Sequence, residues 1–204
     1  LAPSLAEIIA EHGKRYVAVT SGSSGNAFLH HPNIASPGGA TIHPEFARPN
    51  ALHSEVEQAA GPWPEEGKPN SRRISHAFRV LKEHVIQRME PAVALVWSSD
   101  PDGTQHVSGV GSADSDRSLA HVDTQFGRLV EWLEETGRAR DADVVVVSDH
   151  GYSTVREPVK IEGLVRQAGF PGGGRPGGVI VAPNGGSVLF YVNNRNPATA
   201  ERLA

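Results

Sequence analysis

Two pairs of metal-ligating side chains carry the most specific chemistry in this sequence. Asp102 and His106 are four residues apart, and Asp149 and His150 are adjacent. Carboxylate oxygens and imidazole nitrogens together suit zinc, manganese or iron, and also magnesium where carboxylates dominate. The chain contains no cysteine, which excludes disulfides, thiolate metal sites and a cysteine nucleophile. These four residues are therefore the candidate metal ligands.

Each pair follows an uninterrupted apolar run. Val144–Val147 leads into the Asp149 pair, and Ala92–Trp97 leads into the segment that holds the Asp102 pair. Runs without polar alternation predict strands that are buried on both faces, as in the middle of a parallel sheet. Ligands of open α/β sheets bind at the carboxyl ends of such strands. If the two strands are neighbours, we expect all four side chains to converge on one crevice.

A helix is predicted between the two apolar runs. Its apolar positions are spaced by three and four residues, which is typical of one buried helical face, and they are Leu119, Val122, Phe126, Leu129 and Leu133. Gly137 is expected to end this helix. Strand, helix and strand form a βαβ unit with parallel strands, so both candidate pairs should emerge at the same edge of the sheet.

The remaining elements predict an α/β fold with a mainly parallel central sheet in one domain spanning residues 1–204. A strand is expected at Arg15–Thr20, and a hairpin at residues 179–192 around an Asn-Gly turn. Residues 71–89 have a helical apolar stripe, with His76 and His84 off the stripe and expected to face solvent. Residues from about 30 to 70 are rich in Pro, Gly, His and Asn, which predicts an irregular excursion that could face the substrate.

Composition narrows the functional classes. At 204 residues the chain can bury a sizeable core, and a formal net charge of −4 with a pI near 6.2 disfavours binding to nucleic-acid polymers. No apolar run approaches the roughly 20 residues that span a bilayer. A soluble protein is expected, either cytoplasmic or exported, and its oligomeric state is left open.

Two motifs resemble those of a known enzyme family. The segment from Asp100 to His106 resembles the Pro-Asp-x-x-Gly-His loop of the nucleotide pyrophosphatase/type I phosphodiesterase family, and Ser148–Gly151 resembles its Ser-Asp-His-Gly-Met motif. Gln105 and Tyr152 depart from those motifs outside the ligand set. The family belongs to the alkaline phosphatase superfamily, so the resemblance implies an alkaline-phosphatase-like three-layer α/β/α sandwich.

The resemblance also implies a hydrolase of phosphodiester or pyrophosphate bonds in small phosphate esters, with two divalent metal ions, usually zinc and alternatively manganese. One ion would be held by Asp102, His106 and a later histidine. The other would be held by Asp149, His150, an earlier aspartate and a Thr or Ser nucleophile that forms a phospho-enzyme. The nucleophile is expected upstream of this sequence and the last histidine downstream, so no catalytic residue lies inside it, and the chain alone should be an inactive internal fragment.

Three alternatives remain open. A sulfatase, phosphomonoesterase or phosphomutase of the same superfamily would share the site and change the substrate. In a non-catalytic phosphate- or metal-binding module, backbone N–H groups of the Gly-rich loop Ser21–Asn26 could hold a phosphate, and the Asp/His pairs would be ordinary loop residues. An enzyme with Ser23 or Ser24 as nucleophile is disfavoured, because their context is not the Gly-x-Ser-x-Gly elbow.

Overall fold

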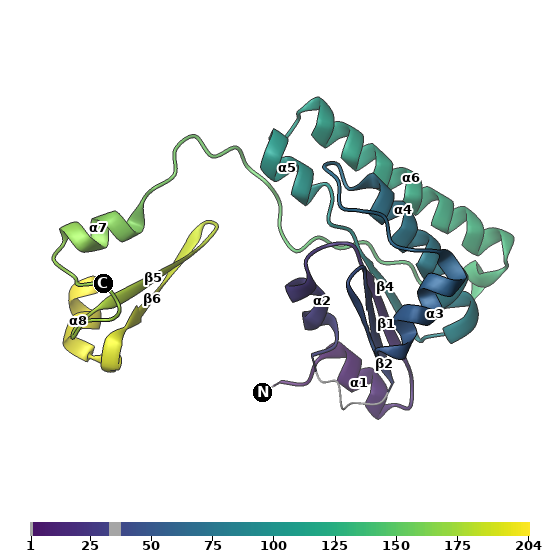
Figure 1. Ribbon diagram of the computed structural model, residues 1–204, viewed down its shortest axis with the longest axis horizontal. Helices are drawn as coiled ribbons and strands as arrows, with labels where there is room; N and C mark the ends of the chain where they lie inside the picture. The colour runs from purple at the N-terminus through teal and green to yellow at the C-terminus, as the bar shows by residue number, and fades with distance from the viewer. Residues whose placement is uncertain (1, 33–37) are drawn as a thin grey trace. The chain divides into compact units, whose positions relative to one another are not determined.

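The computed structural model describes residues 2–32 and 38–204. Its contacts divide the chain into two compact units, Leu1–Thr154 and Val155–Ala204 (Figure 1). A single domain over residues 1–204 stays a prediction.

The first unit contains α1 (Leu5–Glu11), β1 (Tyr16–Thr20), α2 (Ser24–His30), β2 (Gly39–His43), β3 (Phe46–Arg48), α3 (Ala51–Ala60), α4 (Ser71–Val80), the π-helix η1 (Leu81–Met89), β4 (Val93–Trp97), α5 (Asp102–Ser108), α6 (Ala113–Glu135) and the 3-10 helix η2 (Arg138–Arg140).

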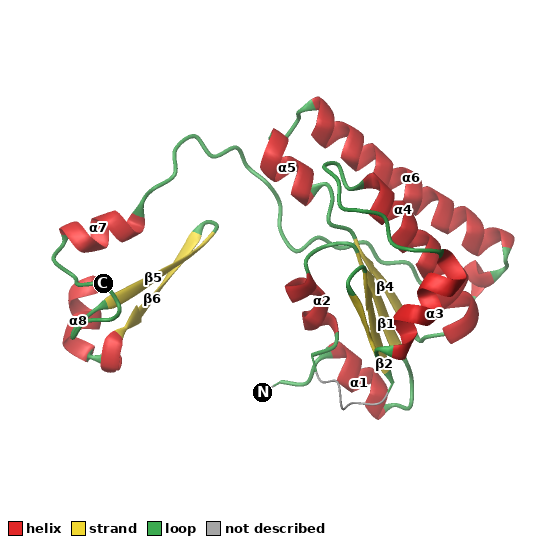
Figure 2. Cartoon of the chain, in the orientation of Figure 1, coloured by secondary structure: helices red, strands yellow, loops and turns green. Residues whose placement is uncertain are grey.

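A four-stranded sheet in the order β3-β2-β1-β4 forms the centre of the first unit. β1 pairs in parallel with β2 and with β4, and only β3 is antiparallel. Val17 and Val19 of β1 belong to a large core with side chains of α3, α4 and α6. Tyr16 and Ala18 pack with Ala6 of α1 in a second, smaller core. Helices therefore cover both faces of the sheet (Figure 2), which confirms the predicted α/β class and its three layers.

The predicted strand at Val144–Val147 is wrong. The segment has no strand pairing, and its four valines are 47 to 81% exposed. The neighbour of β4 is β1, and β4 pairs with no second strand in the described part of the chain. A run of valines fits a buried strand surface, but a parallel strand forms only where a neighbour supplies its hydrogen bonds, and the apolar pattern carries no information about that neighbour.

The predicted irregular excursion at about 30–70 is also largely wrong. It contains the strands β2 and β3 and the ten-residue helix α3, whereas residues 61–70 contain neither helix nor strand. Residues 33–37 of the excursion lie outside the described residues. The Pro and Gly residues that suggested a long loop instead separate short elements, because turns between such elements need the same residue types.

The long helix predicted at 71–89 is confirmed as α4 followed by η1. However, His76 and His84 are buried, so the expectation that they face solvent is wrong. α4 packs against α3, α6 and β1. Because α4 has neighbours on several sides, residues outside its apolar stripe are buried as well.

The second unit is a hairpin with two short helices. It contains α7 (Ile161–Gln167), β5 (Val179–Asn184), β6 (Ser187–Val192), the 3-10 helix η3 (Asn193–Arg195) and α8 (Pro197–Leu203). β5 and β6 pair antiparallel, which confirms the predicted hairpin, and Gly185 and Gly186 join them. Within residues 2–32 and 38–204, no helix has both the length and the apolar character needed to cross a membrane.

The buried imidazole of His76 should make the first unit sensitive to acid. His76 is 4% exposed, its ring centroid lies 4.5 Å from that of Trp63, and the Arg79 guanidinium lies 2.9 Å from its Nδ1. Burial, and secondly the charge of Arg79, lower the pKa of His76 from 6.5 to about 4. The unfolded chain therefore binds a proton at a higher pH than the folded chain does.

We expect the free energy of unfolding to be fully retained above pH 6.5 and to fall as the pH drops from 6.5 to about 4, by up to about 3 kcal/mol from His76. Urea unfolding followed by circular dichroism at several pH values measures this slope. His76→Gln should flatten this slope, whereas substitution of the exposed His12 by Gln should leave it unchanged. Equal slopes in wild type and His76→Gln would contradict the assignment to His76. Burial also lowers the pKa values of four other histidines, which should therefore lower the free energy of unfolding in the same direction as the pH falls: His30, His31, His43 and His84.

Candidate metal centre

The first candidate pair lies on a helix, not on the loop that was expected. Asp102 is the first residue of α5 and His106 lies one turn later, so both project from the same helical face. The distance from His106 Nε2 to Asp102 Oδ1 is 3.5 Å. The Asp-x-x-x-His spacing is itself the i, i+4 signal of a helix, and it could have identified this element from the sequence.

The second candidate pair approaches the first one although its preceding strand is absent. His150 Nε2 lies 3.6 Å from Asp102 Oδ1 and 3.7 Å from Asp149 Oδ2. The backbone N–H of His150 also donates to Asp149 Oδ1 at 3.1 Å. The structure thus gathers both histidines around the carboxylate of Asp102, and Asp149 joins the group through His150.

Tyr152 is a member of this group that sequence reasoning missed. Its hydroxyl donates a 2.6 Å hydrogen bond to Asp102 Oδ1 and a weaker one of 3.3 Å to the backbone oxygen of Asp102. Its ring centroid lies 5.2 Å from that of His106 and 5.5 Å from that of His150. The sequence marked Tyr152 only as a departure from a motif, because nothing in it shows that a residue fifty positions away contacts Asp102.

Partial burial, and secondly the hydrogen bond to Asp102, raise the pKa of Tyr152 above its ordinary value. The hydroxyl therefore keeps its proton at neutral pH and acts as a donor to Asp102 Oδ1. Both imidazoles face this same oxygen, so Asp102 is the residue that the other side chains share.

The donor types fit a zinc or manganese centre, since two carboxylates and two imidazoles are the ligands that such ions take in the absence of cysteine. In the described residues, however, no three or more His, Asp or Glu side chains are arranged to hold one ion. The imidazoles surround the Asp102 carboxylate, and the Tyr152 hydroxyl bonds to the oxygen that they face. Metal binding through that oxygen would require the Tyr152 hydroxyl to release it.

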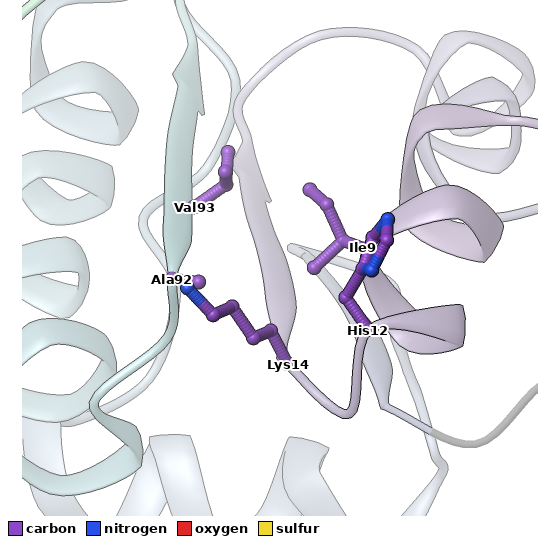
Figure 3. A pocket seen from close by; sticks show the side chains of 5 residues that line it. All are labelled: Ile9, His12, Lys14, Ala92 and Val93. Atoms are coloured by element: carbon purple, nitrogen blue, oxygen red, sulfur yellow. The ribbon is translucent and has the colours of Figure 1, made fainter.

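A separate hollow of about 590 Å³ lies at the other end of the sheet (Figure 3). Lys14 precedes β1, and Ala92 and Val93 stand at the start of β4; Ile9 and His12 complete the lining. The candidate ligands follow the carboxyl end of β4, whereas this hollow adjoins the amino ends of both strands. It is therefore not part of the candidate metal centre.

Comparison with known proteins gave one family match. The family model described as type I phosphodiesterase / nucleotide pyrophosphatase matches residues 9–203. The match includes all four candidate ligands and Tyr152. No curated protein and no solved structure showed a significant match to the chain.

The hydrogen bond between Tyr152 and Asp102 can be tested by titration. Asp102→Asn removes the negative charge beside the hydroxyl, so we expect the pKa of Tyr152 to fall toward its ordinary value. Carbon NMR of ring-labelled tyrosine over the alkaline range measures this pKa, and Tyr152→Phe assigns the signal. Asp123→Asn is the matched control, because Asp123 is an exposed residue of α6. An unchanged Tyr152 titration in Asp102→Asn would contradict the contact.

Proposed function

Since this chain belongs to the type I phosphodiesterase / nucleotide pyrophosphatase family, we propose that it takes part in a metal-dependent hydrolysis of phosphodiester or pyrophosphate bonds. The family match covers most of the chain and confirms the resemblance seen in the two motifs. It also confirms that the chain comes from a family of hydrolases that act on small phosphate esters. The dependence on metal ions and the identity of the ligands are our proposal.

The arrangement around Asp102 is the observation that carries this proposal. Nε2 of His106 and Nε2 of His150 lie 3.5 and 3.6 Å from the same carboxylate oxygen, and Asp149 lies beside His150. These residues come from segments more than forty positions apart in the sequence, so the fold and not local spacing brings them together. Imidazoles and carboxylates that meet at a partly exposed point suit a divalent cation better than they suit structural packing.

We infer that Asp102, His106, Asp149 and His150 hold two divalent ions, zinc or alternatively manganese, together with ligands from sequence outside this chain. When bound, such ions activate a nucleophile and stabilise the charges on the attacking and leaving oxygens of the phosphoryl group. Asp102 and Asp149 supply negative charge that retains the cations. Without a bound ion, the Tyr152 hydroxyl holds Asp102 Oδ1 in place, and an ion at that oxygen would displace the hydroxyl. The nucleophile itself is a Thr or Ser that we place upstream of Leu1.

Metal binding by this chain is the direct test of the ligand set. We expect zinc, titrated against a chromophoric chelator, to bind to wild type, and Asp149→Asn and His106→Gln each to raise the dissociation constant by about tenfold or more. Asp123→Asn should bind zinc as wild type does, because Asp123 is an exposed residue of α6 and is not one of the candidate ligands. Equal zinc affinity in wild type and in both ligand variants would overturn the proposed centre.

Hydrolysis is best tested on the gene product that carries this chain in full. We expect chelator-sensitive cleavage of a chromogenic phosphodiester that zinc or manganese restores, and we expect Asp149→Ala to lower kcat/KM by about a hundredfold or more, since a bound ion supplies several kcal/mol of charge stabilisation. The control variant is Asp123→Ala. Faster cleavage of a phosphomonoester or a sulfate ester would keep the centre and change the substrate class. Absence of cleavage of all three esters would contradict the proposed reaction.

A further inference from the structure

A buried carboxylate lies two residues before the first candidate ligand. Asp100 is only 2% exposed, yet it is not part of the candidate metal centre. Its Oδ1 accepts hydrogen bonds from the backbone N–H of Thr104 at 3.1 Å and from the Thr104 hydroxyl at 2.9 Å. Its Oδ2 accepts from the backbone N–H of Asn70 at 2.6 Å. Three donors to one carboxylate offset the cost of burying it.

The bonds to Thr104 fix the first turn of α5. The first N–H groups of a helix have no partner within the helix, and an acidic side chain next to them both satisfies a donor and complements the helix dipole. The same turn begins with Asp102, the residue that both imidazoles and Tyr152 face. A side chain at Gly103 would lie 3.1 Å from Lys68 Nζ and 3.4 Å from Asp100 Oδ1, so the turn is closely surrounded.

The bond to Asn70 connects this turn to the sheet. The Asn70 side-chain amide donates to the backbone oxygen of Ser21 at 3.3 Å and to the hydroxyl of Ser99 at 3.0 Å. The backbone N–H of Ser99 in turn donates to the Ser21 hydroxyl at 3.1 Å. Ser21 directly follows β1 and Ser99 follows β4 by two positions, while Asn70 directly precedes α4. Four elements thus meet at one polar network that ends on α5.

We propose that Asp100 is a positioning residue of the candidate metal centre, which sets the place of Asp102 and His106 by anchoring α5 to the ends of β1 and β4 and to the start of α4. The proposal rests on the proposed function, because it assigns to those two residues the role of metal ligands. Within the described residues, the Asp100 side chain forms no hydrogen bond or ion pair with the side chain of Asp102 or His106. It acts through the backbone of the turn that carries them.

Asp100→Ala should raise the zinc dissociation constant by about tenfold or more, within the range known for residues that orient ligands. It should also accelerate hydrogen exchange at the Thr104 amide, because that N–H loses its acceptor. A third readout is the nuclear Overhauser contact between the rings of Tyr152 and His106, whose centroids lie 5.2 Å apart; it should weaken as α5 shifts. Asp100→Asn replaces one acceptor oxygen of the carboxylate, and Thr104→Val removes the hydroxyl that donates to Asp100. These two variants serve in place of Asp100→Ala if that variant does not fold.

Val56→Ala is the matched control for simple destabilisation, since Val56 is fully buried in the core on α3. It should lower the free energy of unfolding and leave zinc affinity and the ring contact unchanged. If Asp100→Ala, like Val56→Ala, leaves both the zinc affinity and the ring contact unchanged, Asp100 is merely structural and the inference is overturned. If wild type binds no zinc, the proposed function fails, and the ring contact and the Thr104 exchange alone then decide whether Asp100 positions α5.

Discussion

The parallel pairing of β1 with β4 is the constraint on which the site depends. The two strands run in register from Tyr16 opposite Val93 to Thr20 opposite Trp97, so their carboxyl ends stop at the same level. Ser21 and the segment that begins at Ser98 therefore leave the sheet side by side. Parallel strands place their following segments at one edge, and the polar network of the first unit is built at that edge.

The carboxylates of this edge have two different environments. Asp100 is buried, and the donors to its two oxygens from the described part of the chain are uncharged: two backbone N–H groups and the Thr104 hydroxyl. Asp102 is partly exposed, and imidazoles and a phenol face it. A buried carboxylate surrounded by fixed donors stabilises one local geometry, whereas the partly exposed carboxylate of Asp102 is held by a hydrogen bond from Tyr152 and is accessible to solvent. Two aspartates separated by one residue therefore have different environments.

The Val144–Val147 segment does not extend the sheet beside β4. Its valines are exposed and β4 pairs only with β1 in the described part of the chain. His150 nevertheless reaches Asp102, and Tyr152 holds that approach through its hydroxyl. The second pair is thus brought to the first by side-chain contacts and not by a strand.

The sequence by itself determined the elements whose signals are local. The apolar stripes predicted α6 and the helix that begins at α4, the continuous run at residues 92–97 predicted β4, and the turn residues predicted the β5–β6 hairpin, because each signal arises from neighbours along the chain. The residue types of the two Asp/His pairs also indicated the family and its hydrolytic chemistry. The exact metal-ligand set stays a prediction.

Only the tertiary structure decided which strand lies beside β4, that His76 is buried, and that Tyr152 and Asp100 belong to the surroundings of Asp102. Each of these facts depends on contacts between segments far apart in the chain, such as Asn70 with Asp100 or Tyr152 with Asp102. A hydrogen bond of this kind leaves no periodic trace in the sequence. It exists because the sheet and the helices on its faces bring the two backbones within reach, and that depends on how the whole unit packs.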